Sequence, residues 1–308
     1  MTPITGSIVA LVTPMHEDGS LDYPSLRKLI DWHIAEGTDG IVIVGTSGES
    51  PTVSVEEHRE LIRVAVEQAN KRIPIIAGTG GNSTKEAIYL TQEAEKLGVD
   101  GSLQVAPYYN KPTQEGLYQH YRAIASSTKL PIVVYSVQGR TGINVEPLTL
   151  KRLAEIDNIV GIKEASGNLE QIAKIIEGAS PDFRVWSGND SETLPILSIG
   201  GYGIVSVVSH LAGLQVQDMI HRFLGGDIAG AATIHRRLLP LVNALFVVAN
   251  PIPVKFMLNE VGFNVGGTRL PLVEADDANR PLIVGERTNV IGSRAFKQLI
   301  ADEKWEEA

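Results

Sequence analysis

The chain has no cysteine, and it carries less positive than negative charge. Its 308 residues include 27 Lys and Arg against 36 Asp and Glu, which gives a formal net charge of −9. Without cysteine there is no disulfide, no cysteine nucleophile and no thiolate metal ligand. This excess of negative charge does not favour binding to a nucleic-acid backbone or to an anionic membrane surface. We therefore expect neither nucleic acid nor a membrane as a partner.

Long apolar runs and metal-binding motifs are missing as well. No uninterrupted apolar stretch approaches the roughly 18 residues of a spanning helix. The segment 1–14 has no basic n-region and reads as a first strand rather than a signal peptide. The seven histidines form no HExxH or similar paired spacing, so we expect no metal. Together these features predict a cytoplasmic protein that needs no cofactor.

Short β-prone apolar runs recur along the chain, and a stretch with helical periodicity separates each from the next. The runs centre on Ile8, Val42, Ile76, Leu103, Val133, Gly161, Val185 and Ile204. The expected helices between them are 23–36, 54–70, 83–98, 114–127, 147–155, 168–178 and 191–199. Strands that alternate with crossover helices indicate a parallel sheet. Eight such units predict a (β/α)₈ TIM barrel, and an open doubly wound sheet is the structural alternative.

The strand rhythm stops after residue 209. Three further helices, 210–223, 227–248 and 252–261, predict a C-terminal helical appendage packed on the barrel. The expected division is a catalytic barrel over 1–224, a helical region over 225–277 and an atypical tail over 278–308.

A lysine interrupts the sixth apolar run, IVGIKEASG, at residues 159–167. In a barrel strand Lys163 shares the inward face with Gly161 and Ala165, while Glu164 faces the helices. Small neighbours are expected to leave the lysine room. Lys163 also lies near the C-terminal end of its strand, where active sites of this fold sit. It is either a lysine that snorkels to the barrel mouth or pairs with a carboxylate, or a Schiff-base nucleophile.

Other strand ends carry groups that suit a Schiff-base reaction. The second run ends in GTSGES, residues 45–50, where Thr46 and Ser47 supply hydroxyls that hold a carboxylate or relay a proton. The alternative is a glycine-rich turn with capping hydroxyls. The fifth run ends in Tyr135, a candidate proton carrier, and Arg140 follows as a fork for a carboxylate. A strand Tyr is otherwise a core residue, and a loop Arg is otherwise a surface residue.

Five separated motifs resemble the 4-hydroxy-tetrahydrodipicolinate synthase family of pyruvate-dependent class I aldolases. They are GTSGES, PYYNKPTQEGLYQHY, YSVQGRTG, GIKEASGN and NPIPVK, and the resemblance runs from about Gly6 to Pro271. It implies condensation of pyruvate with L-aspartate-4-semialdehyde through a lysine Schiff base, in lysine and diaminopimelate biosynthesis. The alternatives are a sibling aldolase acting on a sugar-derived 2-keto acid and a catalytically inactive small-molecule binding protein.

The resemblance also assigns catalytic roles. It implies that Lys163 forms the imine with pyruvate and that Tyr135 exchanges protons with it. Thr46 and Tyr109 are implied to relay protons, with Tyr109 reaching into the neighbouring subunit's site. A homo-oligomer, either a dimer or a dimer of dimers, follows from that arrangement.

Four further residues are implied to bind substrate. Ser47, Gly188 and the backbone at Val205 would hold pyruvate, and Arg140 would engage the carboxylate of the semialdehyde. The family usually has Tyr-Asn-Val-Pro where this chain has Tyr-Ser-Val-Gln at 135–138. Gln in place of Pro frees the backbone φ, so we expect a more mobile segment around Arg140.

In lysine-inhibited members of the family, a cleft at the dimer interface binds L-lysine. The positions of this chain that match it are Ser50, His58, Asn82, Glu86 and Tyr108. The resemblance therefore implies feedback inhibition by L-lysine. The alternative is that Asn82 and Glu86 simply begin the helix expected over 83–98.

The tail does not fit this family. RPLIVGERTNVIGSRAFKQLIADEKWEEA, residues 280–308, resembles the start of the folate-binding domain of cobalamin-dependent methionine synthase. A pterin site needs the rest of that second barrel, which this chain does not contain. A folate-binding or methyl-transfer role is therefore the weakest hypothesis.

Overall fold

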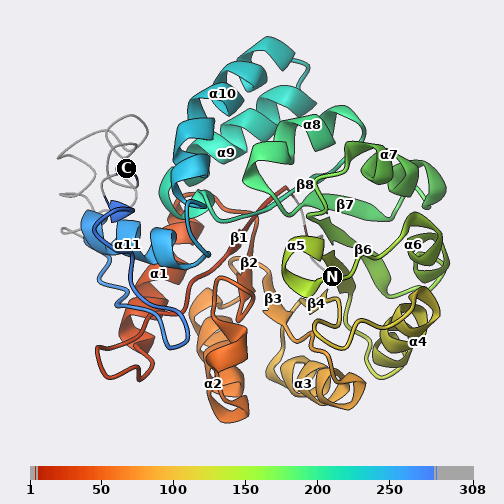
Figure 1. Ribbon diagram of the computed structural model, residues 1–308, viewed down its shortest axis with the longest axis horizontal. Coiled ribbons are helices and arrows are strands. Elements are labelled where there is room, and N and C mark those ends of the chain that lie inside the picture. Colours follow the sequence, from red (N-terminus) through yellow and green to blue (C-terminus); the bar gives the residue numbers. More distant parts are fainter. Residues whose placement is uncertain (1–3, 5, 281, 283–308) are drawn as a thin grey trace.

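The computed structural model describes residues 4, 6–280 and 282. Their parallel strands close into one barrel, in which each strand pairs with the next and the eighth pairs with the first (Figure 1). The strands are β1 (Ser7–Ala10), β2 (Gly40–Ile43), β3 (Ile75–Gly78), β4 (Gly101–Val105), β5 (Ile132–Ser136), β6 (Ile159–Glu164), β7 (Arg184–Ser187) and β8 (Gly203–Ser206). The predicted TIM barrel is confirmed, and each predicted strand centre falls inside its strand.

Helices surround the barrel and follow the strands in turn (Figure 1). They are α1 (Tyr23–Ala35), α2 (Val55–Ala69), α3 (Thr84–Leu97), α4 (Gln114–Ala125), α5 (Gln138–Thr141), α6 (Pro147–Leu153), α7 (Leu169–Gly178), α8 (Thr193–Ser198), α9 (Ser209–Leu224), α10 (Ile228–Ala244) and α11 (Ile252–Val261). Short 3₁₀ turns precede α2 and α8 as η1 (Ser50–Thr52) and η2 (Asp190–Glu192). Sequence reasoning missed α5, and it extended α10 to 248, four residues too far.

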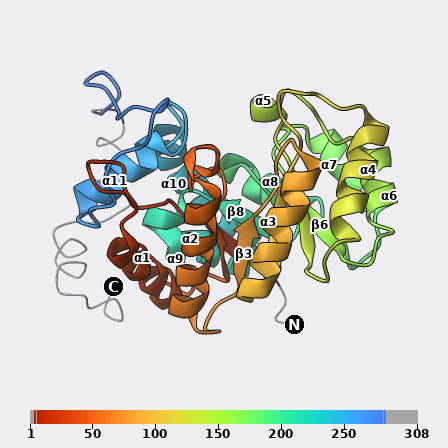
Figure 2. The ribbon, with the colours of Figure 1, turned by 90° about the horizontal axis from the view of Figure 1, so that it is seen from below.

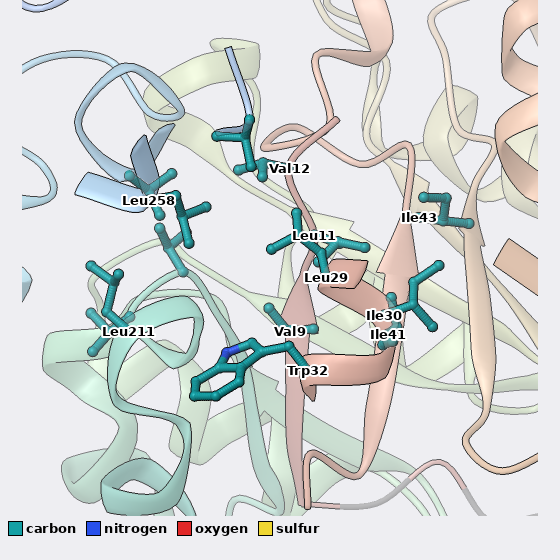
Figure 3. Close-up of a cluster of buried hydrophobic side chains, with 14 of the residues drawn as sticks. Val9, Leu11, Val12, Leu29, Ile30, Trp32, Ile41, Ile43, Leu211 and Leu258 are labelled. Carbon is teal, nitrogen blue, oxygen red and sulfur yellow. The ribbon is translucent and has the colours of Figure 1, made fainter. Parts of the chain in front are cut away.

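The strands are buried on both faces because side chains alternate between the barrel interior and the helices. Val9 of β1 and Ile41 of β2 point outward and lie beside Leu29 and Trp32 of α1 (Figure 3), and Ile43 belongs to the same buried cluster. A separate cluster fills the interior with inward residues: Ile8, Ala10, Val42, Ile76, Leu103, Val133, Tyr135, Val137, Trp186 and Val205. The interior is therefore a packed core whose open end carries the loops after the strands.

Two of the last three helices, α9 and α11, pack beside β1 and α1, and α10 packs against α9 (Figures 1 and 2). Figures 1 and 2 show α11 next to α1, and Leu258 of α11 and Leu211 of α9 join the outer core around β1 (Figure 3). Within the described part of the chain, no helix combines the length and the apolar character needed to cross a membrane. The division at 224/225 and 277/278 stays a prediction. The tail resemblance lies outside the described residues, apart from Arg280 and Leu282.

Candidate active site

Lys163 and Tyr135 lie side by side near the C-terminal ends of β6 and β5. The two residues are paired in the sheet register, and Lys163 also pairs with Trp186 of β7. The Lys163 Nζ lies 4.1 Å from the centroid of the Tyr135 ring. Lys163 is 5% exposed and Tyr135 is 6% exposed. The structure thus brings an amine and a phenol-bearing ring into contact where water is largely excluded.

Gly161 lies closely against Arg184 and Trp186 of the neighbouring strand β7. A Cβ at this position would lie 2.2 Å from the Arg184 carbonyl oxygen and 2.6 Å from the Trp186 ring. The space that glycine provides is therefore occupied by Trp186 and the neighbouring strand. The expectation that small neighbours leave Lys163 room stays a prediction.

The segment 45–50 folds into a tight turn at the end of β2. Glu49 has a φ of +58°, and its N–H donates to the Thr46 carbonyl at 3.1 Å. The Thr13 hydroxyl donates to the Gly48 carbonyl at 2.7 Å and ties the turn to the segment after β1. Ser47 is 1% exposed, whereas Thr46 is partly exposed. The turn presents the two adjacent hydroxyls in different environments.

Asn250 connects this turn to Arg140. Its side-chain Nδ2 donates to Ser47 Oγ at 2.9 Å, and its carbonyl accepts a hydrogen bond from Arg140 Nη2 at 3.2 Å. Sequence reasoning did not single out Asn250, although the NPIPVK motif that contains it was recognised. The sequence did offer one indication of its role: Asn250 is a polar residue in a motif that otherwise begins a helix.

A buried ion pair between Lys255 and Glu49 holds the turn at residues 45–50 in place. Lys255 of α11 contacts Glu49 at 2.9 Å, and their side chains are 2% and 1% exposed. Lys255 Nζ also donates to the carbonyls of Thr13 and Gly267, and the Arg269 N–H donates to Glu49 Oε2 at 2.9 Å. Burial lowers the pKa of Lys255, and the Glu49 carboxylate opposes that shift. Sequence reasoning missed this pair.

Two adjacent pockets open at this end of the barrel. The larger has a volume of about 220 Å³, and Thr46, Val137 and Arg140 are part of its wall. The smaller shares Thr46 with it and reaches Tyr135. Lys163 lines neither of these two pockets, but the ring of Tyr135, in the wall of the smaller one, contacts its amine.

Gly188 and Val205 lie on the other side of Lys163, at β7 and β8. A Cβ on Gly188 would come within 2.7 Å of the Ala165 Cβ, and the Gly188 N–H donates to the Glu164 carbonyl at 2.7 Å. Val205 belongs to the same interior cluster as Tyr135. Glycine at 188 lets the segment after β7 approach the end of β6 closely.

Asp190 fixes the end of β8, and sequence reasoning missed it. Its carboxylate accepts hydrogen bonds from the Ser206 hydroxyl at 2.5 Å and from the Val207 N–H at 3.1 Å. Burial raises the pKa of Asp190, while these hydrogen bonds lower it. The residue holds the backbone just beyond Val205.

The departures at 136 and 138 are accommodated within local structure. Ser136 is fully buried, accepts the Val145 N–H at 3.2 Å and donates to Asn144 at 3.3 Å. Gln138 is the first residue of α5, where a backbone N–H has no intrahelical partner and proline would be tolerated. Arg140 lies in this short helix, which ends at Gly142. Gly142 has a φ of +71°.

A third pocket, of about 160 Å³, gathers four of the five residues predicted to bind L-lysine. Ser50, His58, Glu86 and Tyr108 line it, and Asn82 Nδ2 donates to the Tyr108 carbonyl at 3.3 Å. Burial lowers the pKa of His58, whose Nε2 lies 2.9 Å from the Gly78 carbonyl. Within the described residues the Glu86 carboxylate forms no ion pair, so no cation neutralises this acidic group in the pocket lining.

Tyr109 is the one predicted catalytic residue that this chain does not bring to its own site. It is 91% exposed and has a φ of +71°. A left-handed backbone is unusual for an aromatic residue, and here it accompanies a side chain that stands in solvent.

Comparisons with known proteins show the family of this chain. Residues 3–285 match the model of the dihydrodipicolinate synthetase family. The 4-hydroxy-tetrahydrodipicolinate synthase of Ralstonia nicotianae is 57% identical over 272 residues, which are 88% of this chain and 92% of the relative.

Two solved structures are similar over nearly their whole length. Dihydrodipicolinate synthase from Cyanidioschyzon merolae, with lysine bound, has a TM-score of 0.91 at 46% identity and covers 93% of this chain and 98% of its own. The chloride-inhibited enzyme from Acinetobacter baumannii, in complex with pyruvate, has a TM-score of 0.91 at 46% identity and covers 94% and 99%.

Proposed function

This chain belongs to the dihydrodipicolinate synthetase family, and we propose that Lys163 and Tyr135 are the groups that perform its reaction. The protein is a lyase of lysine and diaminopimelate biosynthesis. It condenses pyruvate with L-aspartate-4-semialdehyde to give 4-hydroxy-tetrahydrodipicolinate. The contact between the Lys163 amine and the Tyr135 ring is the observation that carries the proposed roles. A cytoplasmic location is part of the same proposal.

The proposed reaction begins at Lys163. Its neutral amine attacks the ketone carbon of pyruvate, and loss of water leaves an imine that is protonated on nitrogen. This imine draws electrons from the methyl group, which loses a proton to give an enamine. The enamine carbon then attacks the aldehyde of the second substrate, and the Lys163 imine forms again. The amino group of that substrate attacks the imine carbon, which closes the ring, breaks the bond to Lys163 and returns its free amine. We propose that Tyr135 carries protons in these steps, since its ring contacts the Lys163 amine and it shares a pocket wall with Thr46.

The substrate carboxylates are assigned to the groups around this centre. Ser47, Gly188 and the Val205 backbone are proposed to hold pyruvate. Arg140 lines the larger pocket and is proposed to bind the carboxylate of the semialdehyde, because a guanidinium matches a carboxylate with two parallel hydrogen bonds. Sequence relatives and structural neighbours give no support to the sibling aldolase.

The condensation rate of pyruvate with aspartate-4-semialdehyde, measured on the purified full-length chain, tests this proposal. We expect turnover that saturates in both substrates. If there is no turnover but borohydride still traps pyruvate on the protein, the aldehyde assignment fails. If neither occurs, the chain is an inactive binder.

Tyr109 is proposed to complete the site of a neighbouring subunit. Its exposure and its position after β4 leave it available to a second copy of the chain. We therefore expect the active species to be a homo-oligomer. Specific activity should fall at dilutions where sizing detects monomer, because a monomer's site lacks this phenol. Full specific activity in the monomer would contradict the arrangement.

We also propose that L-lysine binds the pocket lined by Ser50, His58, Glu86 and Tyr108. The pocket has room for a small amino acid, and the Glu86 carboxylate suits an ammonium group. Burial lowers the pKa of His58, which disfavours a repelling positive charge on its ring. The similar Cyanidioschyzon merolae protein was crystallised with lysine bound.

Replacing Glu86 with Gln is expected to weaken inhibition by L-lysine at least about tenfold, since a charge-assisted hydrogen bond becomes a neutral one. The measurement is the lysine concentration that halves turnover, taken relative to the uninhibited rate of each variant. Glu170→Gln on α7, which removes an exposed carboxylate away from this pocket, is the control. Equal inhibition of all three proteins would exclude this pocket as the lysine site.

A further inference from the structure

Asn250 occupies a buried position between the two groups assigned to substrate carboxylates. The residue is 5% exposed. Its amide group donates to Ser47 Oγ at 2.9 Å, and its carbonyl accepts from Arg140 Nη2 at 3.2 Å. The side-chain Oδ1 is buried and has no hydrogen-bond partner among the described residues. One residue thus contacts both substrate-binding side chains.

The direction of the bond between Asn250 and Ser47 matters chemically. A serine hydroxyl has one hydrogen to donate and two lone pairs that accept. Because Asn250 donates to Ser47 Oγ, it occupies a lone pair and leaves the hydroxyl hydrogen free. Ser47 is 1% exposed, so water does not compete freely for that hydrogen. A carboxylate only accepts, and it needs this hydrogen.

We propose, on the basis of the proposed function, that Asn250 is a positioning residue for both substrates. Its amide sets the Ser47 hydroxyl as a donor to the pyruvate carboxylate. Its main-chain carbonyl holds the Arg140 guanidinium over the larger pocket, ready for the second carboxylate. A structural amide would hold the fold equally well in either orientation, whereas this role depends on the amide as a donor.

Asn250→Asp replaces the hydrogen-bond donor that faces Ser47 with an acceptor and keeps nearly the same side-chain shape. The aspartate accepts the Ser47 hydrogen and adds a negative charge near the pyruvate carboxylate. We expect KM for pyruvate to rise at least about tenfold, with a smaller change in kcat. A protonated aspartic acid is again a donor, so KM should move back toward the parent value as the pH falls. Asn250→Ala should raise KM without this recovery.

The test measures KM for each substrate against pH in the parent, Asn250→Asp and Asn250→Ala proteins, with Tm recorded for each. Ser47→Ala supplies a double-variant cycle. In the Ser47→Ala background, Asn250→Asp should lose most of its effect on pyruvate KM, because the hydroxyl on which it acts is gone. The full-length chain is used throughout.

Failure of this inference is distinct from failure of the proposed function. An inactive parent protein would overturn the proposed function. An active parent with an unchanged pyruvate KM in Asn250→Asp would overturn the role of Asn250. Equal, pH-independent losses in both Asn250 variants, with lowered Tm, would also overturn it and show a structural residue.

Discussion

Lys163→Ala is expected to lower the condensation rate by at least about a thousandfold, because the variant lacks the amine that we propose forms the covalent imine. Borohydride reduction in the presence of pyruvate should attach one adduct to the parent chain and none to the variant. Mass spectrometry of the reduced protein and of its peptides measures both outcomes. The pyruvate-dependent adduct is expected on the peptide that contains Lys163.

Two variants separate the nucleophile from the charge. Lys163→Arg keeps a cation beside Tyr135 but has no amine that deprotonates in a protein, so it should be as inactive as the alanine variant. Lys174→Ala removes an exposed lysine paired with Glu170 on α7, and both turnover and labelling should be unchanged. Labelling that persists in Lys163→Ala would place the Schiff base on another lysine.

The fold was predictable because its signals are local and repeated. Each strand is an apolar run bounded by turns, and the capping box at Ser54 and Glu57 marks the start of α2 in both sequence and structure. The helix α5 gave no such signal, because Gln138, Gly139, Arg140 and Thr141 contain no apolar periodicity. It forms through contacts with its surroundings rather than from propensity.

The candidate site was predictable where the fold itself places the residues. Lys163 and Tyr135 lie near the C-terminal ends of their strands, Thr46 follows β2, and a closed barrel brings strand ends together. Asn250 and Lys255 come from a helical region with no fixed relation to the strands. Lys255 contacts Glu49 across 206 positions of sequence, and no spacing rule predicts such a contact. The left-handed φ of Glu49 was not predicted either, because the GTSGES motif was interpreted through its hydroxyl groups.

The Lys255–Glu49 pair gives the largest expected effect on stability. Lys255→Met preserves the unbranched shape but leaves the Glu49 carboxylate buried with its cation removed. Breaking a buried pair from one side costs about 3–5 kcal/mol of unfolding free energy. The measurement is Tm together with denaturant unfolding of the full chain. We also expect lower activity, since Glu49 belongs to the turn that presents Thr46 and Ser47.

The second partner shows whether this loss comes from an unpaired charge or from poor packing. Glu49→Gln combined with Lys255→Met removes both charges and retains an acceptor for the Arg269 N–H, so the double variant should be more stable than Lys255→Met alone. Lys174→Met breaks an exposed pair and should change the free energy by no more than about 0.5 kcal/mol. A double variant no more stable than Lys255→Met would assign the loss to packing around α11. Recovery would show that charge pairing between Lys255 and Glu49 holds α11 to the turn that carries Thr46 and Ser47.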